Sequence, residues 1–398
     1  MPFPYDFPFY FHGTGTGARG AYVVFRGPMR VLVYESYSDL TLLDELTERI
    51  TSMAYTTALH GGFKSCTIRA SITLAEGLLY LRRGNLPGRH FKHLQVLEGH
   101  QTRWEGRIMP IELAWSRDQV ELSLTALGYW SSCRDQRVAV VDYSGGSNTV
   151  DSIIKAMLTA ECPDISSDQS NIDAAAGAVN LTLAVDTYAQ DHIIQALAPL
   201  GDSDDATYDF AIWEDRVPYY AARNVTAVDW EIPLYSIDQG RITQDPAHLR
   251  NAADSYDGTT RTAAASDTDS QARYPVRDAV VDVPTGTTAA RALDARDRYV
   301  SEHKDPQQES TFSISGPVYR RQQFGPEPGG RSAIRAGDVV RITGLTPIAD
   351  TASLDNLRTF FVVDTSYDAL SDVVRITPDR PASTLSVFLA RQGVEVTR

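Results

Sequence analysis

Hydrophobic and polar residues alternate along much of the first third of the chain. Segments AYVVFRG and MRVLVYES, from Ala21 to Ser36, have the period of half-buried strands. Four more segments show strand-like patterns and are bounded by glycines or polar residues: GGFKSCTIRASI, FKHLQVLEG, RWEGRIMPIELAW and QVELSLTALGYW. Five or six strands at this spacing predict a small antiparallel β-barrel. One segment departs from the pattern: the Leu and Ile spacing of Asp39–Ser52, with Asp39 as a cap, predicts a helix beside this barrel.

The pattern becomes helical from Asn148. Isoleucine, methionine and leucine recur on one face of Asn148–Cys162, which Pro163 ends, and a similar face runs along Thr187–Gly201. The segment Tyr208–Arg223 has two apolar arms around a polar turn at Glu214–Arg216, which predicts a hairpin. Together these elements predict a small α+β domain.

The last third of the chain returns to strands. One strand is expected within Ala227–Tyr235, a long exposed excursion such as a hairpin tip over the polar residues 251–274, and a helix over Thr287–Lys304. The strands expected after it are ESTFSISGPV, GDVVRITGL, RTFFVVDTSYDA, DVVRITPD and TLSVFLARQG. They predict a second barrel. Two barrels around an α+β domain suggest a duplicated fold, although no repeat is visible in the sequence.

Composition and charge narrow the class of protein. Hydrophobic residues make up 42% of the 398, which excludes a wholly disordered chain. The 37 Lys and Arg against 51 Asp and Glu give a net charge of −14, which argues against a tight grip on a phosphate backbone. It is compatible with a surface that must not hold DNA.

Several other features exclude common interpretations. Cys66, Cys133 and Cys162 are too widely spaced for a metal motif and suggest buried, reduced thiols. No apolar run is long enough for a membrane span. The N-terminal MPFPYDFPFYFHG lacks the basic start of a signal peptide and is expected to be an extended aromatic arm that lies on its own body or on a neighbouring subunit.

Glycines and histidines form two weak site motifs. Gly15, Gly17 and Gly20 match G-x-G-x-x-G, but a proline-broken arm precedes them and a strand follows, so we expect a hinge and not a nucleotide site. His90, His93 and His100 lie close together without an evident fourth ligand, and solvated strand histidines are expected rather than zinc. Asp267 and Asp269 lack the glycine and glutamate of a calcium loop.

Candidate acid–base groups do not form a recognisable catalytic set. The conspicuous carboxylates are Glu105 and the pairs Asp204/Asp205 and Glu214/Asp215, and nothing in the sequence places two of them across a substrate. We therefore predict no catalytic, cofactor-binding or metal-binding residues. Four arginines beside strand ends are expected either to form an ordinary barrel rim or to pair with carboxylates of another subunit: Arg103, Arg107, Arg320 and Arg321.

Three blocks in this order resemble one family. They are GGFKSCTIRAS with TRWEGRIMPIEL and VELSLTALGYW; then YDFAIWEDRVPYYAAR; then HLRNAADSYDG through RAGDVVRITGL to FFVVDTSYDALSDVVRITP. The sequence resembles the baseplate or tail-tip hub proteins of tailed bacteriophages, similar to the T4 baseplate hub and also found in phage-like injection machines and gene-transfer particles. The resemblance spans about residues 30–378.

The resemblance implies a mainly β fold with α+β parts, built from two tail-tube-like antiparallel β-barrel domains and a small α+β domain. The expected division is an arm at 1–29, a first barrel at 30–147, the α+β domain at 148–224 and a second barrel at 225–398, with a loop and helix inserted at about 257–310. Compared with this family, the sequence is expected to be without the C-terminal extension that often carries a peptidase or fibre-binding part.

The implied function is structural: a homotrimeric tail hub of the virion that joins the sixfold tail tube to the threefold tail tip and forms part of the DNA channel. Implied partners are a tail tube or distal tail protein above, tip, spike or fibre proteins below, and a tape-measure protein. DNA would pass through the lumen without specific binding, and the particle would assemble in the host cytoplasm. The alternatives are a cell-wall-degrading or carbohydrate-active enzyme of the tail tip and a receptor-binding tail protein.

Overall fold

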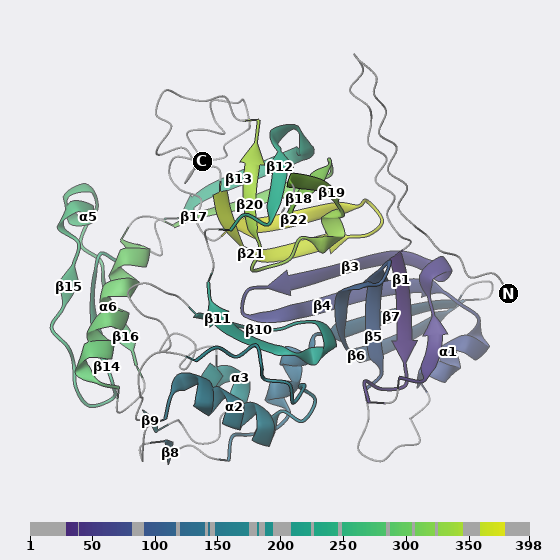
Figure 1. The fold of residues 1–398 in the computed structure, drawn as a ribbon, viewed down its shortest axis with the longest axis horizontal. Coiled ribbons are helices and arrows are strands. Elements are labelled where there is room, and N and C mark those ends of the chain that lie inside the picture. The colour runs from purple at the N-terminus through teal and green to yellow at the C-terminus, as the bar shows by residue number, and fades with distance from the viewer. Residues whose placement is uncertain are drawn as a thin grey trace.

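A computed structural model describes residues 29–38, 40–81, 91–116, 120–139, 142–143, 148–174, 181–182, 188–193, 208–223, 227–245, 249–283, 287–304, 307–322, 325–344 and 359–378. Two strand modules, an α+β domain and an outer helix-and-strand unit make up this part of the chain (Figure 1). The mainly β fold class with α+β parts is confirmed. The N-terminal arm, including Gly15, Gly17 and Gly20, lies outside the described residues.

The first module contains seven strands and one α-helix. Its elements are β1 (Met29–Tyr34), β2 (Leu42–Glu45), β3 (Ile50–Ala58), β4 (Gly61–Ser71), α1 (Leu74–Leu81), β5 (His93–Glu98), β6 (Gln101–Trp115) and β7 (Val120–Leu127). The strands pair antiparallel in the order β2–β1–β5–β6–β7–β4–β3.

The second module is assembled from strands that are far apart in sequence. They are β12 (Trp230–Pro233), β13 (Ile237–Asp245), β17 (Gln307–Ile314), β18 (Val318–Gln322), β19 (Gly325–Gly329), β20 (Val339–Thr343), β21 (Thr359–Asp368) and β22 (Val373–Pro378). Their order is β19–β18–β12–β20–β21–β22–β17–β13, with β12 and β20 parallel and the other neighbours antiparallel. The expected strand TLSVFLARQG lies outside the described residues.

The two modules share a five-stranded core of the same topology. The order β3–β4–β7–β6–β5 in the first corresponds to β13–β17–β22–β21–β20 in the second, all antiparallel and in the same chain order. A short 3₁₀ helix precedes β3 (Thr47–Arg49) and β13 (Leu234–Ser236) alike.

Two irregularities in the ladders coincide as well, whereas the shifts at Thr56/Thr57 in β3–β4 and at Val96/Leu97 in β5–β6 have no counterpart in the second module. The β3–β4 pairing shifts between Ile50 and Ser52, and β13–β17 shifts between Ile237 and Gln239. The β6–β7 pairing shifts after Ile108, and β21–β22 shifts after Val362. Because bulges bend a strand at a defined place, their coincidence argues for duplication more strongly than strand number alone.

The modules are joined edge to edge, and β3 pairs antiparallel with β21 from Ala54↔Asp368 to Ala58↔Asp364. Thr57 Oγ1 and Thr365 Oγ1 lie 2.6 Å apart, and the backbone N–H of Ala336 donates to Thr57 Oγ1 at 2.8 Å. Side chains of both modules form one hydrophobic core, and the pairings among the described residues close neither module on itself. The two predicted barrel domains are therefore present as open modules, and one sheet continues through both.

The α+β domain packs under the first module. It contains β8 (Asp142–Tyr143), α2 (Val150–Glu161), β9 (Leu181–Thr182), α3 (Ala189–His192) and the hairpin β10 (Tyr208–Ile212) and β11 (Pro218–Ala222). The predicted helix at Asn148–Cys162 and the predicted hairpin are both present, and the second helix is described only as far as residue 193. β10 runs parallel to the start of β4, where a Cβ on Gly62 would lie 2.1 Å from the Ile212 carbonyl oxygen. Glycine is therefore required at this crossing, also because Gly62 has φ +80°.

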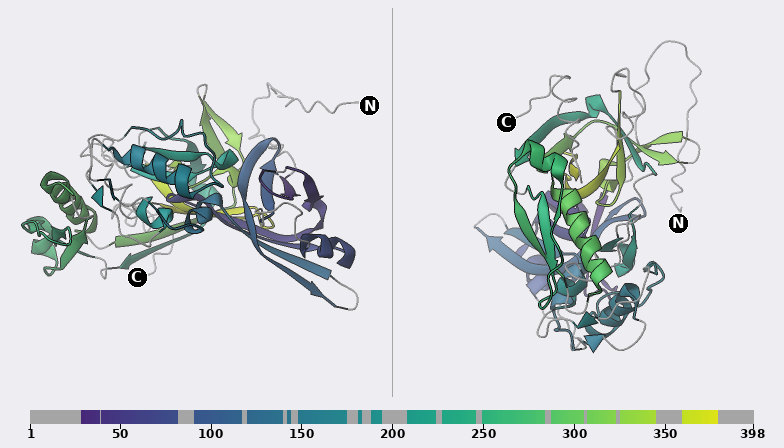
Figure 2. Two further views of the ribbon diagram at one scale, coloured as in Figure 1. Left: turned by 90° about the horizontal axis from the view of Figure 1, so that it is seen from below. Right: turned by 90° about the vertical axis from the view of Figure 1, so that its left-hand side faces the viewer.

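An outer unit stands at one end of the molecule (Figures 1 and 2). It consists of β14 (Ala252–Tyr256), β15 (Ala265–Ser266), α5 (Thr268–Arg273), β16 (Asp278–Asp282) and α6 (Ala289–His303). β14 pairs with β15 and β16, and α6 packs on β14. The prediction of an exposed hairpin tip over residues 251–274 is therefore wrong, as is the assignment of Tyr256 to the second barrel. Asn251, fully buried, organises the unit, because its side chain accepts from the Arg277 N–H at 2.9 Å and donates to the Pro275 carbonyl at 3.2 Å.

The helix predicted at Asp39–Ser52 is also wrong. The segment contains β2, the 3₁₀ helix Thr47–Arg49 and the start of β3. The N–H of Leu46 donates to the Val31 carbonyl, and β2 pairs with β1, so strand partners override the helical spacing of the leucines. The helix predicted at Thr287–Lys304 is confirmed as α6, but the expected pair of matching helices in the two halves does not exist at these positions.

A test of the module joint follows from the Thr57 contacts. Thr57→Val leaves the buried N–H of Ala336 without its acceptor, so we expect the free energy of unfolding to fall by about 1–3 kcal/mol in denaturant titrations. Thr67→Val, at an exposed position of β4, is the matched control and should change it by less than about 0.5 kcal/mol. Equal effects of the two substitutions would show that the joint does not depend on this hydrogen bond.

Candidate functional site

One face of the joined sheet is polar across both modules. A single row of paired residues crosses six strands, from β4 through the joint to β13: Ser65, Thr56, Ser366, Arg375, Ser313 and Gln239. A second polar row crosses the first module at Ser52, Arg69, Ser123 and Glu112. Because neighbouring strands in register place paired residues on the same face, these rows form a continuous polar surface.

The opposite face of the same strands carries the core. The adjacent row reads Cys66, Tyr55, Tyr367, Val374, Ile314 and Ile237, and all but Ile237 are buried. The rings of Tyr55 and Tyr367 are 5.2 Å apart across the joint. These strands thus present an apolar face to the core and a polar face to solvent, which is the arrangement of a channel wall or of an outer surface.

The polar face carries charges of both signs. The charged residues that the register places on it are Glu112, Glu121, Glu309, Asp364, Asp368, Arg69, Arg241 and Arg375, and the exposed Lys64 lies beside Ser65 on β4. Arg69 and Glu121 are more than half exposed and lie 4.0 Å apart. Tight binding of a phosphate backbone needs clustered cations, and here Ser, Thr and carboxylates lie between the basic residues.

A three-way junction lies at the tip of the β10–β11 hairpin. Trp213 meets Phe63 of the first module edge to face at 5.2 Å, and the Arg335 guanidinium of the second module lies 4.6 Å from the Trp213 ring. Arg335 also donates to both carboxylate oxygens of Glu214, at 2.8 and 3.1 Å. The hairpin tip therefore fixes the α+β domain to both modules at once.

Glu105 anchors the same hairpin tip. It is 2% exposed and accepts a hydrogen bond from the backbone N–H of Arg216 at 2.9 Å. Burial raises the pKa of Glu105 to about 7, against the lowering effect of that hydrogen bond. Asp215 and Arg216 both have positive φ, at 58° and 60°, which is a strained turn that the anchor helps to hold.

The other candidate acid–base groups do not join Glu105 around a substrate site. The Glu214 carboxylate binds Arg335, and the residues Asp204 and Asp205 lie outside the described part of the chain. Asp267 caps α5 by accepting from the N–H of Ser270 at 2.8 Å and pairs with Lys304 at 3.0 Å, so it serves the outer unit.

The histidines are not a cluster in the structure. His93 is buried, contrary to the expectation of solvation, and its Nδ1 lies 2.7 Å from the Tyr129 hydroxyl oxygen. Desolvation, with Arg216 nearby, lowers the pKa of His93 to about 4, so the ring is neutral at pH 7. His100 is in the β5–β6 turn, and His90 lies outside the described residues. Within those residues, no group of three or more His, Cys, Asp or Glu is placed to hold a metal ion.

Three of the four arginines singled out in the sequence pair within this chain. Arg103 contacts Glu98 at 2.9 Å, Arg107 donates through Nη2 to Asp135 at 2.9 Å, and Arg321 lies 3.7 Å from Glu231. The Arg320 guanidinium lies 6.0 Å from the Trp230 ring. Cross-subunit partners are therefore not needed to explain Arg103 and Arg107, whose side chains are 15% and 4% exposed.

Two other sequence expectations have definite outcomes. Cys66, Cys133 and Cys162 are buried free thiols, as predicted, and burial raises the pKa of Cys66 and Cys133. No described helix has the length and apolar character that a membrane crossing requires.

Sequence reasoning missed the joint residues Thr57 and Thr365 and the junction residues Trp213 and Arg335. A threonine at an inward position of an alternating strand was the available signal for Thr57, because such a hydroxyl needs a partner when buried.

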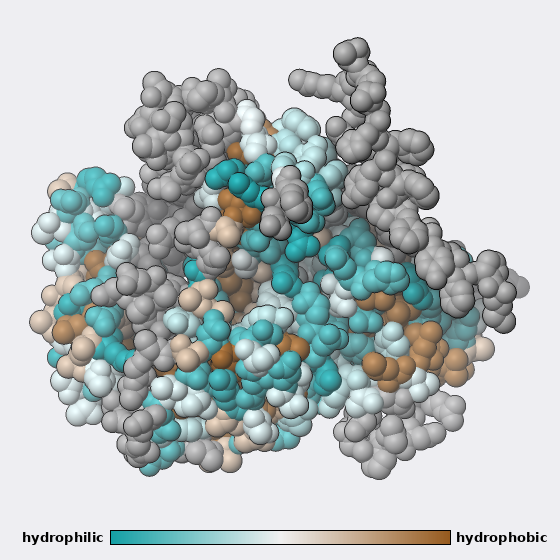
Figure 3. Space-filling model, viewed as in Figure 1, coloured by the Kyte–Doolittle hydropathy of each residue, from teal (hydrophilic) through white to brown (hydrophobic). Residues whose placement is uncertain are grey.

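Exposed leucines gather on the first module, away from the polar rows. Helix α1 exposes Leu74, Leu78, Leu79 and Leu81 by 44–55%, and Leu40 and Leu42 near β2 are exposed by 64% and 49%. Figure 3 shows an apolar patch over the α1 end of the molecule. Contiguous apolar surface of this kind marks an interaction site more often than a free surface.

The Glu105 anchor predicts a pH effect on stability. Between pH 4.5 and 7 the folded protein keeps a proton that the unfolded chain releases, so the free energy of unfolding should fall as pH rises, by up to about 3 kcal/mol. Glu105→Gln keeps an acceptor for the Arg216 N–H without a charge, so its stability relative to wild type should improve from pH 4.5 to pH 8 in denaturant titrations. Glu112→Gln, on the exposed face, should leave the wild-type pH dependence in place. A wild-type dependence that survives Glu105→Gln would contradict the assignment.

No protein-family model matches the chain, and no curated protein sequence matches it. Several solved structures have a similar fold. The 43 kDa tail protein of prophage MuSo2 from Shewanella oneidensis superposes with a TM-score of 0.59 at 11% identity, over 88% of this chain and 98% of that chain. A tail protein from Neisseria meningitidis MC58 gives 0.59 at 12% identity, over 88% and 96%.

A prophage tail protein from Listeria monocytogenes EGD-e superposes with a TM-score of 0.51 at 12% identity, over 91% of this chain and 98% of that chain. All three similarities extend over nearly the whole of the known proteins, so they concern the complete arrangement of modules and not one shared piece. The fold implied by the sequence resemblance is confirmed: this chain has the fold of the prophage tail proteins.

Proposed function

We propose that the protein is a structural virion component, a homotrimeric tail hub that joins a sixfold tail tube to a threefold tail tip and forms part of the DNA channel. The observation that carries the proposal is the internal duplication, in which two modules of the same core topology are joined edge to edge by β3 and β21. The fold of phage tail proteins supports the same conclusion.

The duplication gives a physical reason for the symmetry. Within the chain, the β21 edge of one module contacts the β3 edge of the other, so the contact is between two different surfaces. A contact of this type propagates head to tail, and it forms a ring when the rotation closes. Three chains of two modules would present six equivalent positions to a tube above and three identical chains to a tip below.

The polar face of the joined sheet suits the wall of the channel. Its Ser and Thr side chains, with acidic and basic residues interspersed, would let DNA pass without specific binding, whereas a cluster of Lys and Arg would retain it. Three chains at −14 each would carry a formal charge of about −42. The apolar face, packed in the shared core, would keep the wall rigid.

The remaining parts are assigned from the resemblance. Residues 30–147 and 225–398 would be the tube-like domains, the second interrupted by an insertion that forms the outer unit from β14 to α6. Residues 148–224 would be the α+β domain, and residues 1–29 an arm. Partners would be a tail tube or distal tail protein above, tip, spike or fibre proteins below, and a tape-measure protein. The protein would reside in the virion at the tail tip or baseplate after assembly in the host cytoplasm.

The role of Glu105 favours a structural protein over an enzyme of the tail tip. Glu105, a buried carboxylate with a raised pKa, accepts from the Arg216 N–H, which is an anchoring role. We expect the purified protein to give no clearing band on a zymogram of bacterial cell walls. A band that Glu105→Gln abolishes would support the enzyme instead.

The oligomeric state tests the proposal directly. The chain has a mass of 43.8 kDa, so light scattering on the purified protein should give about 131 kDa, and averaged particle images should show threefold symmetry around a central hole. A monomer at every concentration and salt condition, or a twofold dimer, would contradict the hub.

A further inference from the structure

Several strand edges have a partner on one side only within the described residues, and two of them, on β6 and β13, concern the joint. The end of β6, from Met109 to Trp115, pairs with β7 but not with a second strand, because β5 pairs only as far as Arg107. β13 pairs with β17 along Ile237–Asp245, and no other described strand pairs with it. Long unpaired edges are normally shortened, charged or covered, and β6 and β13 are among the longer strands of the chain.

The duplication makes these two edges equivalent to the two edges that meet inside the chain. The coincident bulges align β3 with β13, so that Ile50 corresponds to Ile237, and β21 with β6, so that Val362 corresponds to Ile108. The backbone hydrogen bond from the Ile108 N–H to the Lys92 carbonyl has its counterpart from Val362 to Asp338. Since β3 and β21 are paired in the chain, β13 and β6 are the copies of the same joint that have no partner among the described strands.

We propose that β6 of one copy pairs antiparallel with β13 of the next copy, in the register of the internal β3–β21 joint. This inference rests on the proposed trimer and names the contact that builds it. The internal pairs Thr56↔Ser366 and Tyr55↔Tyr367 translate into Thr243↔Glu112 and Ile242↔Leu113 between copies. Three such contacts would continue the sheet, and its polar rows, around the whole ring.

Exposed apolar residues beside the β6 edge support a protein neighbour there. Trp115, at the end of β6, is 69% exposed, and the register places it opposite Gly240, whose lack of a side chain leaves room for the indole. Helix α1 packs on β6, where Gly77 faces Leu113, and it carries the exposed leucines Leu78, Leu79 and Leu81.

At the internal joint, the segment that corresponds to α1 contacts the neighbouring module. In the second module, the segment between β17 and β20 contains the 3₁₀ helix Arg331–Ala333, and the carbonyl of Ser332 accepts from the Tyr55 hydroxyl of β3 at 2.7 Å. In the first module, the corresponding segment between β4 and β5 contains α1. Helix α1 is therefore expected to pack against the second module of the next copy, which would cover its leucines.

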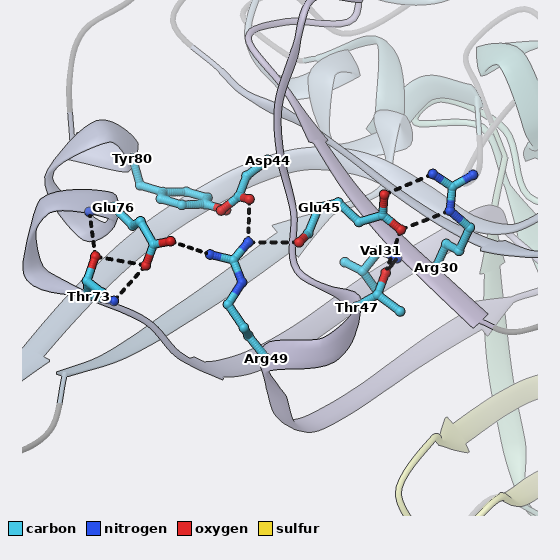
Figure 4. Close-up of polar contacts among 9 residues, drawn as sticks. All are labelled: Arg30, Val31, Asp44, Glu45, Thr47, Arg49, Thr73, Glu76 and Tyr80. Atoms are coloured by element: carbon cyan, nitrogen blue, oxygen red, sulfur yellow. Dashed lines mark hydrogen bonds and ion pairs between the residues drawn. The ribbon is translucent and has the colours of Figure 1, made fainter. Parts of the chain in front are cut away.

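Helix α1 is held firmly enough to present this surface. Figure 4 shows Arg49 between the carboxylates of Asp44 and Glu76, with the Tyr80 hydroxyl donating to Asp44 at 2.7 Å. The Glu76 carboxylate also accepts from the Thr73 N–H at 2.7 Å at the start of the helix. Because these contacts lie on the side of α1 that faces its own module, the exposed leucines are not needed to hold the helix.

The register is tested by disulfide trapping in the full-length protein. The internal counterpart of Glu112↔Thr243 is a non-hydrogen-bonded pair, because the flanking hydrogen bonds run from Leu59 to Val363 and from Ala369 to Met53. Such pairs bring Cβ atoms closest. Under mild oxidation, the double variant Glu112→Cys/Thr243→Cys should give covalent dimers and closed trimers on non-reducing gels. Leu113→Cys/Thr243→Cys, one residue out of register on β6, should give at least about tenfold less, because successive residues of a strand alternate and Glu112 and Leu113 face opposite ways.

Three outcomes separate the proposals. A trimer with in-register trapping supports both the hub and this contact. A trimer in which the two double variants trap equally, or not at all, overturns the β6–β13 contact and leaves the trimer standing. A protein that stays monomeric overturns both.

The leucine patch gives an independent readout. Leu78→Gln should raise the concentration at half-assembly by about tenfold, measured by light scattering on dilution, while the melting temperature of the diluted protein stays within a few degrees of wild type. Val276→Gln, at a 59% exposed site of the outer unit, is the control and should leave assembly unchanged. Equal effects of the two substitutions would show that α1 is not covered by a neighbouring copy.

Discussion

The antiparallel pairing of β3 with β21 is the contact on which the rest of the structure depends. It joins strands that are more than 300 residues apart and carries a buried hydroxyl pair, Thr57 and Thr365, inside one continuous core. A strand edge presents a row of unpaired backbone N–H and C=O groups, and here these groups pair within the chain and hold the two duplicated modules together. The same constraint leaves one edge of each type, on β6 and on β13, without a partner among the described residues.

Register gives the joined sheet its two unlike faces. Since side chains alternate along each strand, a joint in register carries the polar row of one module into the polar row of the next, as at Thr56 and Ser366. A slip of one residue at the joint would align the polar row of one module with the apolar row of the other, so that Tyr55 and Tyr367 could not both face the core. The buried hydrogen bond from Ala336 to Thr57 opposes such a slip, because it has an acceptor in one register only.

The hairpin tip of the α+β domain contains a strained turn and a buried carboxylate, and it fixes the α+β domain to both modules. Asp215 and Arg216 adopt positive φ, and Glu105 is buried with a raised pKa. In return, the tip contacts the first module through Phe63 and the second through Arg335. Perturbed carboxylates often mark catalytic sites, but this one has the geometry of an anchor.

Local patterning was sufficient for the elements whose partners are close in sequence. The helix at Asn148–Cys162, the β10–β11 hairpin, α6 and most strands follow from periodicity, because each buries a face that its own spacing defines. The tertiary structure decided what depends on distant partners: that Asp39–Ser52 is not a helix, that β14 leaves the second barrel for the outer unit, and that the barrels open into one sheet. Strand edges pair through backbone N–H and C=O groups, which every residue except proline carries alike. Side-chain patterning therefore predicts which segments are strands but not which strands pair with each other.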